Sequence, residues 1–250
     1  MVDVTYRGDT SNQIIEWMFG YMIAKEKGYC LNSGSIHGFS KIPYHLQGNV
    51  VNDNLLKTSQ WGCQNCELDD ILNHNGKVLV DSFLQKVKFF QKYLPDYQRY
   101  VVSDYTTNVM PNDNDLTIHL RLGDYEQMGI NLPFKFYEWG INNLKYNNYI
   151  LITDSPYSPI VQNLLLIGDN IKIIHQDKYR DFDFIQKSKN VLISQSSYSW
   201  LASWTGVSEN IYSIFHNEFT TKCMWKKDAG YDDIVLTDDK IDKRFKNIYL

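Results

Sequence analysis

The stretch LTIHLRLGDY, residues 116–125, contains the pattern from which the fold of the second half of the chain can be predicted. Four Leu or Ile residues alternate in it with three polar residues, Thr117, His119 and Arg121. The period of two predicts a β-strand over 116–122 with its polar side chains on one side.

Strand and helix patterns alternate on the C-terminal side of this stretch. Such alternation predicts a parallel sheet with helices on both faces, which is an α/β fold. The expected helices lie around residues 133–145, 158–168, 180–189 and 196–206, and the expected strands at 148–153, 171–176 and 190–195.

The N-terminal part begins with the same kind of unit. A short strand over VDVTYRG is followed by a helix over 10–28, where Thr10 and Gln13 have capping-box spacing and Gly28 has the place of a C-terminal glycine. Residues 29–76 show no regular pattern, and residues 80–94 predict a second helix. The polar segment TTNVMPNDNDL indicates a change of lobe, so we expect domains at 1–110 and 111–250.

Composition narrows the class of protein. The 250 residues are 43% hydrophobic and carry a net charge of -4, which does not favour a nucleic-acid partner or an anionic membrane surface. No run of about 18 apolar residues predicts a membrane span. The N-terminus lacks a basic segment followed by an apolar run, so we expect a cytoplasmic protein. Cys63 and Cys66 form one CxxC without a second pair, which favours reduced thiols over zinc.

Arg121 is expected to have an anionic partner. In a covered sheet, His119 and Arg121 lie on one face, roughly 6–7 Å apart, and a buried arginine needs a carboxylate or an anionic ligand. Ligands of open α/β sheets bind at the carboxyl ends of the strands, where Arg121 lies and where Gly123 permits a close approach. The chain has 20 Lys and 5 Arg, and arginine suits phosphate oxygens. Two interpretations stay open: a phosphate site, or an ion pair with Asp124 or Asp154.

A second anion site is indicated where the strand over 190–195 runs into the helix over 196–206. Helix N-termini carry free N–H groups and the positive end of the helix dipole. The alternative is ordinary helix capping by Ser196 or Ser197. The serines at this junction are Ser194, Ser196, Ser197 and Ser199.

Taken together, these motifs resemble the alpha-1,2-fucosyltransferase family, glycosyltransferase family 11. HLRLGDY is similar to the family's HxRxGDY motif, and SNQIIEWMFGYMIAKEKG to its opening Asn-Gln and aromatic helix. VDSFLQKVKFF, LPFKFYEWGI, ILITDSP and FIQKSKNVLISQSSYSWLASW resemble further family segments in the same order. The chain departs from the family at Leu122, where a second basic residue is usual, and at RGDTS, which replaces glycines.

The resemblance implies a GT-B-like α/β fold of two facing Rossmann-like lobes. It implies an inverting, metal-independent transfer of L-fucose from GDP-fucose to a glycan hydroxyl, with no cofactor besides the donor. The N-terminal lobe would be on the acceptor side, and the C-terminal lobe would bind the nucleotide sugar. The resemblance implies donor-site roles for Asn12, His119, Arg121, Ser197 and Ser199. Gly123, Asp154 and Ser196 are further candidates for the donor site because of their places at the strand ends and the helix entrance.

Catalysis in such an enzyme depends on stabilising the leaving diphosphate, which a fixed arginine and helix N–H groups can do without proton transfer. A general base could deprotonate the acceptor hydroxyl, and Asp9 and Asp124 are both candidates. The acidic pairs at 113–115 and 181–183 are interpreted as loop or helix-cap features rather than metal ligands.

Other functions fit the same sequence. The donor could be another nucleotide sugar, such as a xylose or rhamnose donor, or the chain could be a catalytically idle module that binds nucleotide sugars or glycans. A dinucleotide-dependent oxidoreductase would need a GxGxxG turn after a strand, and the sequence has none.

Overall fold

The computed structural model describes residues 1–58, 68–81, 87–216, 237 and 239–249. The chain is a mixed α/β protein with two sheets, both largely parallel. It divides into two compact units, the first over Met1–Asp104 and the second from Tyr105 onward. Cys63, Cys66 and the aromatic segment at 82–86 lie outside the described residues.

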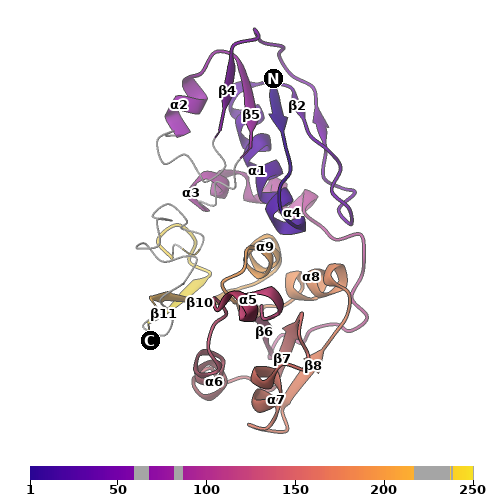
Figure 1. The fold of residues 1–250 in the computed structure, drawn as a ribbon, viewed down its shortest axis with the longest axis vertical. Helices are drawn as coiled ribbons and strands as arrows, with labels where there is room; N and C mark the ends of the chain where they lie inside the picture. The colour runs from indigo at the N-terminus through magenta and orange to yellow at the C-terminus, as the bar shows by residue number, and fades with distance from the viewer. Residues whose placement is uncertain (59–67, 82–86, 217–236, 238, 250) are drawn as a thin grey trace. The chain divides into compact units, whose positions relative to one another are not determined.

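The first unit has a five-stranded sheet in the order β3-β2-β1-β5-β4 (Figure 1). All neighbouring strands are parallel except β2 and β3, which are antiparallel. The strands are β1 (Val2–Val4), β2 (Leu31–Asn32), β3 (His45–Leu46), β4 (Leu55–Lys57) and β5 (Lys77–Val80).

Helix α1 (Thr10–Lys27) connects β1 to β2 and supplies much of this unit's core. Gly28 ends it in the left-handed conformation, as the sequence predicts. The N-cap is Asp9 rather than Thr10, because the Asp9 carboxylate accepts a hydrogen bond from the Thr10 backbone N–H at 2.8 Å. The capping-box prediction was therefore wrong by one residue.

The predicted helix over 80–94 was also partly wrong. Val80 ends strand β5, and the helical structure farther along is divided into short pieces. The strands β2 to β4 lie in the segment that shows no pattern in the sequence, because two or three residues are too few to produce a periodic signal. The remaining helices of this unit are α2 (Leu68–Asn73), α3 (Val87–Phe90), the 3₁₀ turn Gln91–Tyr93 and α4 (Leu94–Tyr100).

The second unit has a six-stranded parallel sheet in the order β11-β10-β9-β6-β7-β8 (Figure 1). The predicted alternation of strands and helices is confirmed, and Ser158 caps α7 with Pro159 in the first position. The short helix α5 and the strands β10 and β11 were not predicted. The strands are β6 (Leu116–Leu120), β7 (Tyr149–Thr153), β8 (Ile171–Ile174), β9 (Asn190–Leu192), β10 (Asn210–His216) and β11 (Phe245–Tyr249). The helices are α5 (Gly123–Met128), α6 (Phe134–Asn143), α7 (Pro159–Leu165), α8 (Lys178–Gln186) and α9 (Ser197–Thr205).

Strand β6 is buried on both faces. It ends at Leu120, so the predicted strand over 116–122 was two residues too long and Arg121 follows the strand instead of belonging to it. Its Leu and Ile side chains belong to an apolar cluster with residues of α6 and α7. On its other face, Thr117 donates to Ser188 at 2.8 Å, and His119 contacts Ser194. The polar side chains of the strand are therefore accommodated by hydrogen-bonding partners beside α8 and α9.

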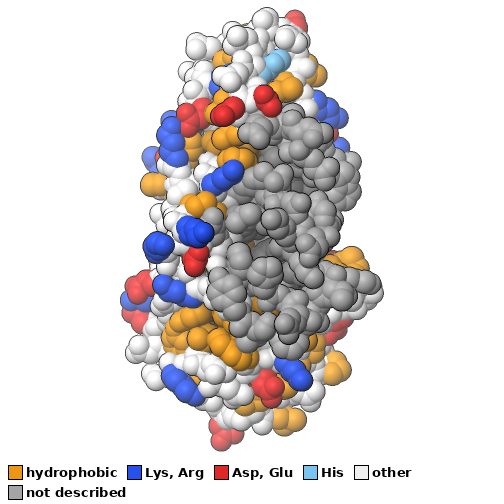
Figure 2. Space-filling model, turned by 90° about the vertical axis from the view of Figure 1, so that its left-hand side faces the viewer, with side chains coloured by type: hydrophobic (Ala, Val, Ile, Leu, Met, Phe, Trp, Pro, Cys, Tyr) orange, Lys and Arg blue, Asp and Glu red, His pale blue; other side chains and the backbone are white. Residues whose placement is uncertain are grey.

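No helix in the described part of the chain combines the length and the hydropathy that a membrane span needs. On the face of the molecule drawn in Figure 2, acidic and basic side chains are interspersed rather than gathered by sign.

Candidate functional site

The order of strands in the second unit defines a position for a ligand. From β6 the chain proceeds to β7 and β8 on one side, whereas β9, β10 and β11 lie on the other side. The strand order therefore reverses between β6 and β9, and open α/β sheets bind ligands at such a switch point, outside the carboxyl ends of the strands. Arg121 follows β6 and the serine-rich junction follows β9, so both predicted anion-binding segments lie at this point.

His119 bridges the two strands. It is 5% exposed, and its Nδ1 lies 2.7 Å from the Ser194 hydroxyl. Its ring lies against the ring of Tyr198, with centroids 5.4 Å apart. Burial and the nearby Arg121 charge lower the pKa of His119 to about 3, so the imidazole is neutral at pH 7. His119 can orient a hydroxyl or a ligand, but it adds no positive charge to the site.

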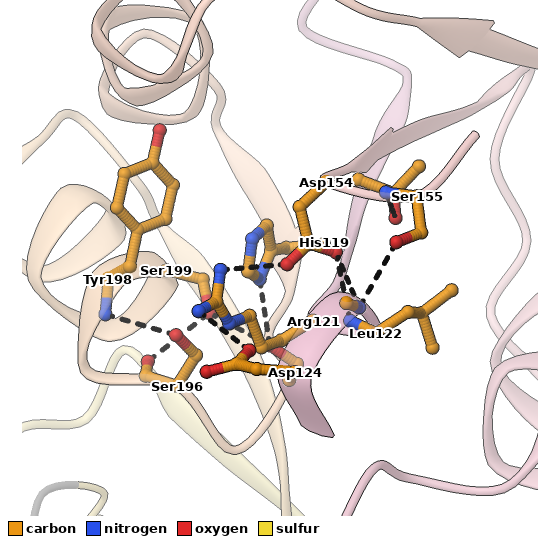
Figure 3. A network of polar contacts seen from close by, with 12 residues as sticks. His119, Arg121, Leu122, Asp124, Asp154, Ser155, Ser196, Tyr198 and Ser199 are labelled. Carbon is orange, nitrogen blue, oxygen red and sulfur yellow. Dashed lines mark hydrogen bonds and ion pairs between the residues drawn. The ribbon is translucent and has the colours of Figure 1, made fainter. Parts of the chain in front are cut away.

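Arg121 is held between two carboxylates (Figure 3). Nη1 lies 2.7 Å from Oδ2 of Asp154, and Nη2 lies 2.8 Å from Oδ1 of Asp124. Its guanidinium carbon is 5.4 Å from the centre of the Tyr125 ring. Both carboxylates that the sequence suggested as alternative partners are therefore engaged, while a third of the side chain stays exposed.

Asp154 also fixes the backbone that follows β6. Its Oδ1 accepts from the backbone N–H groups of Leu122 at 3.0 Å and Gly123 at 3.2 Å. The hydroxyl of Ser155 accepts a second bond from Gly123 N–H at 3.1 Å. A Cβ on Gly123 would lie 2.9 Å from Asp154 Oδ2, so the close approach predicted at this glycine is made by a carboxylate of the protein.

The serines of the β9–α9 junction have different roles. Ser196 is the N-cap of α9, and its hydroxyl accepts from the Tyr198 backbone N–H at 3.3 Å. Ser199 is fully buried, and its hydroxyl lies 3.4 Å from that of Ser194. Ser197 is half-buried and begins the helix. The capping interpretation thus holds for Ser196, and the N–H groups of the first turn remain beside the switch point.

Asp9 and Asn12 belong to the first unit. Asp9 caps α1, and its Oδ1 also accepts from the Thr10 hydroxyl at 3.1 Å. The amide of Asn12 lies beside Gly8, where an added Cβ would meet its nitrogen at 2.7 Å. Their predicted roles as base and sugar contact stay predictions.

Sequence reasoning missed three partners at this site. Ser155 follows Asp154 directly, and Tyr125 follows Asp124, so both were within quoted motifs but carried no separate signal. The contact of Tyr198 with His119 joins residues far apart in sequence. Among the residues that the structure describes, no group of three or more His, Cys, Asp or Glu side chains could hold a metal ion.

Comparisons with known proteins add no family assignment. No protein-family model matches the chain, and no curated protein matches its sequence.

Proposed function

We propose that the chain is an inverting, metal-independent glycosyltransferase of the GT-B arrangement, which transfers L-fucose from GDP-fucose to a glycan hydroxyl. The observation that carries this proposal is the position of Arg121 and the β9–α9 junction on opposite sides of the switch point between β6 and β9. A donor diphosphate at that point would meet a guanidinium on one side and the N-terminus of a nine-residue helix on the other.

The contacts of Arg121 suggest how it would take up a diphosphate. Asp154 is bound to two backbone N–H groups and would stay in place. Asp124 is about half exposed, and its ion pair to Arg121 is on the surface. In the proposed donor complex, a phosphate oxygen replaces Asp124 at Nη2, and Asp154 keeps the guanidinium oriented.

Bond cleavage then follows from electrostatics. As the bond from the sugar to the diphosphate breaks, negative charge grows on the leaving phosphate. Arg121 and the N–H groups of α9 stabilise this charge, and neutral His119 holds Ser194 in the same wall of the site. Asp9 and Asp124 both stay candidates for the base that accepts the proton of the acceptor hydroxyl.

The test is a donor screen by thermal shift, followed by an activity assay. GDP at 100 times its dissociation constant should add about 2.7 kcal/mol of stability, and UDP and dTDP should add less. Transfer from GDP-fucose should survive EDTA. A preference for UDP would redirect the proposal to another donor sugar, and the absence of stabilisation by any nucleotide would contradict it.

A further inference from the structure

The first unit has a switch point of its own, and charged residues lie at it. From β1 the chain proceeds to β2 on one side, whereas β5 and β4 lie on the other. Arg7 lies in the loop after β1, Asp81 follows β5, and Lys57 is the last residue of β4. Because these strands are parallel, their carboxyl ends meet at one edge of the sheet.

One buried carboxylate holds two cations at this edge. Asp81, with only 5% of its side chain exposed, accepts from Nε and Nη2 of Arg7, the latter at 2.9 Å. Its Oδ2 also lies 2.9 Å from Nζ of Lys57. The pair with Arg7 holds the pKa of Asp81 below its usual range, so Asp81 is ionised at pH 7. One positive charge would neutralise the Asp81 carboxylate, so Arg7, Lys57 and Asp81 together carry one net positive charge.

Both cations keep donors that point away from Asp81. Within the described part of the chain, Nη1 of Arg7 has no acceptor, and Asp81 is the one acceptor of Lys57 Nζ. The side chains are 34% and 57% exposed, respectively. A guanidinium fork and an ammonium group with free N–H bonds are the donors that recognise carboxylate and phosphate oxygens.

A buried acid lies behind the pair. Glu16 of α1 has no exposed surface, and its Oε2 accepts from the Arg7 backbone N–H at 2.8 Å. Its Oε1 has no hydrogen-bond partner among the described residues. Burial raises the pKa of Glu16 to about 7, so near pH 6 it is mostly protonated and leaves the excess positive charge at the edge uncompensated.

We propose that Arg7 and Lys57 form a binding site for an oxyanion, a carboxylate or phosphate group carried by the second substrate. Calling that substrate the acceptor rests on the proposed function. The acceptor would then be an acidic glycan, whose acid group is bound by Arg7 Nη1 and Lys57 Nζ. Asp81 anchors both cations, and Glu16 holds the backbone of Arg7.

The test uses three sugars that differ in charge: D-glucuronate, glucose 6-phosphate and neutral glucose. Each is titrated into the full chain at pH 6 in low salt, with binding followed by ligand-observed NMR. At least one charged sugar should bind about tenfold or more tightly than glucose, and added salt should weaken that binding. The tighter of the two charged sugars distinguishes a carboxylate ligand from a phosphate ligand.

Two variants locate the site. Arg7→Gln and Lys57→Gln should each reduce binding of the charged sugar about five- to tenfold. The control is Arg99→Gln, which removes the same charge from an exposed arginine of the same unit that lies over the Tyr100 ring. If Arg7→Gln does not fold, the binding measured with Lys57→Gln tests the site, because this variant keeps the Arg7–Asp81 pair.

Equal affinity for all three sugars, or unchanged binding of the charged sugar to Lys57→Gln, would overturn the site. GDP is titrated into the same samples to separate the two proposals. If GDP binds but the three sugars bind equally, only the oxyanion site is contradicted. If a charged sugar binds more tightly than glucose but GDP does not bind, the proposed function is contradicted and the oxyanion site is supported.

Discussion

Arg7 and Arg121 occupy equivalent places in their two sheets, yet their surroundings have opposite charge. Each lies after a strand at which the strand order reverses. Arg7 shares one buried carboxylate with Lys57, whereas Arg121 lies between two carboxylates, Asp154 and Asp124. With Glu16 protonated, the first group carries one net positive charge, and the second carries one net negative charge.

The difference shows that the place of an arginine in a fold does not by itself make an anion site. Arg7 can accept an anion without losing a contact, because Nη1 has no acceptor among the described residues. In the proposed donor complex, Arg121 exchanges Asp124 for the anion. If Arg121 binds a diphosphate as proposed, its affinity for that ligand depends on how firmly each carboxylate is held.

Replacing Arg121 with lysine should have the largest effect. Lysine keeps the charge but loses the planar fork, so turnover should fall by about two to three orders of magnitude, or about 3–4 kcal/mol in the barrier. The melting temperature should change much less, because lysine can still pair with Asp154. Steady-state kinetics and thermal unfolding of the one variant measure both quantities.

The matched control for Arg121 is Arg180→Lys, since Arg180 also pairs with a carboxylate three residues away in the same unit. That variant should turn over normally. Normal turnover of Arg121→Lys with a melting temperature several degrees lower would show that Arg121 serves a structural ion pair. The carboxyl edge of the second sheet would then not bind the diphosphate through this arginine.

Glu16 should make stability depend on pH. Its pKa is about 7 in the folded protein against an ordinary 4.5, so the folded state binds more protons between these values. The free energy of unfolding should therefore fall by about 3 kcal/mol as pH rises from 4.5 to 8, and Glu16 should contribute no further change above about pH 8. Urea unfolding of the protein and of Glu16→Gln from pH 4 to 8 measures the difference.

The glutamine variant removes the titrating group and keeps an oxygen that can accept from Arg7 N–H. The control is Asp181→Asn. Burial raises the pKa of Asp181 to about 6, so its contribution to the pH dependence of stability should end at a lower pH than that of Glu16. Parallel stability curves for the protein and Glu16→Gln would show that folding does not raise the pKa of Glu16. Glu16 would then be ionised at pH 6, and the difference in charge between the two sheet edges would be smaller.

Removing the carboxylate of Asp154 should cost about 2 kcal/mol of stability. Asp154→Ala leaves the buried backbone N–H of Leu122 without its acceptor and frees one end of Arg121. Gly123 N–H keeps its bond to Ser155, which limits the loss. Denaturant unfolding measures the change, and a loss below about 0.5 kcal/mol would show that Asp154 is not the fixed partner.

Asp124→Ala should have the smallest effect on stability, within about 1 kcal/mol, because its pair with Arg121 is exposed. GDP affinity should rise roughly fivefold, since the competing carboxylate is gone and about 1 kcal/mol of exchange is avoided. Calorimetric titration with GDP measures this rise. Weaker GDP binding would contradict the exchange, and tighter binding with slower turnover would identify Asp124 as the base.

The regular parts of the second unit could be predicted because their signals are local. A period of two marks β6, and Ser158 before Pro159 marks the start of α7. Weak or absent local signals account for the short strands that were not predicted and for the misplaced N-cap of α1. Strands as short as β2 and β3 leave no periodicity. Asp9 and Thr10 are both good capping residues, so their residue types do not tell which of them begins the helix.

From the sequence alone it could be predicted that His119 lies on a covered strand, that Arg121 lies at the carboxyl end of that strand, and that a serine-rich helix entrance follows farther along the chain. The sequence also narrowed the partners of Arg121 to Asp124, Asp154 or an anion. Two contacts could be found only in the folded chain: both carboxylates pair with Arg121, and Arg7 meets Asp81 across 74 residues of sequence. Ion pairing depends on distance in space, and the strand order that brings distant residues to one sheet edge leaves no periodic pattern in the sequence.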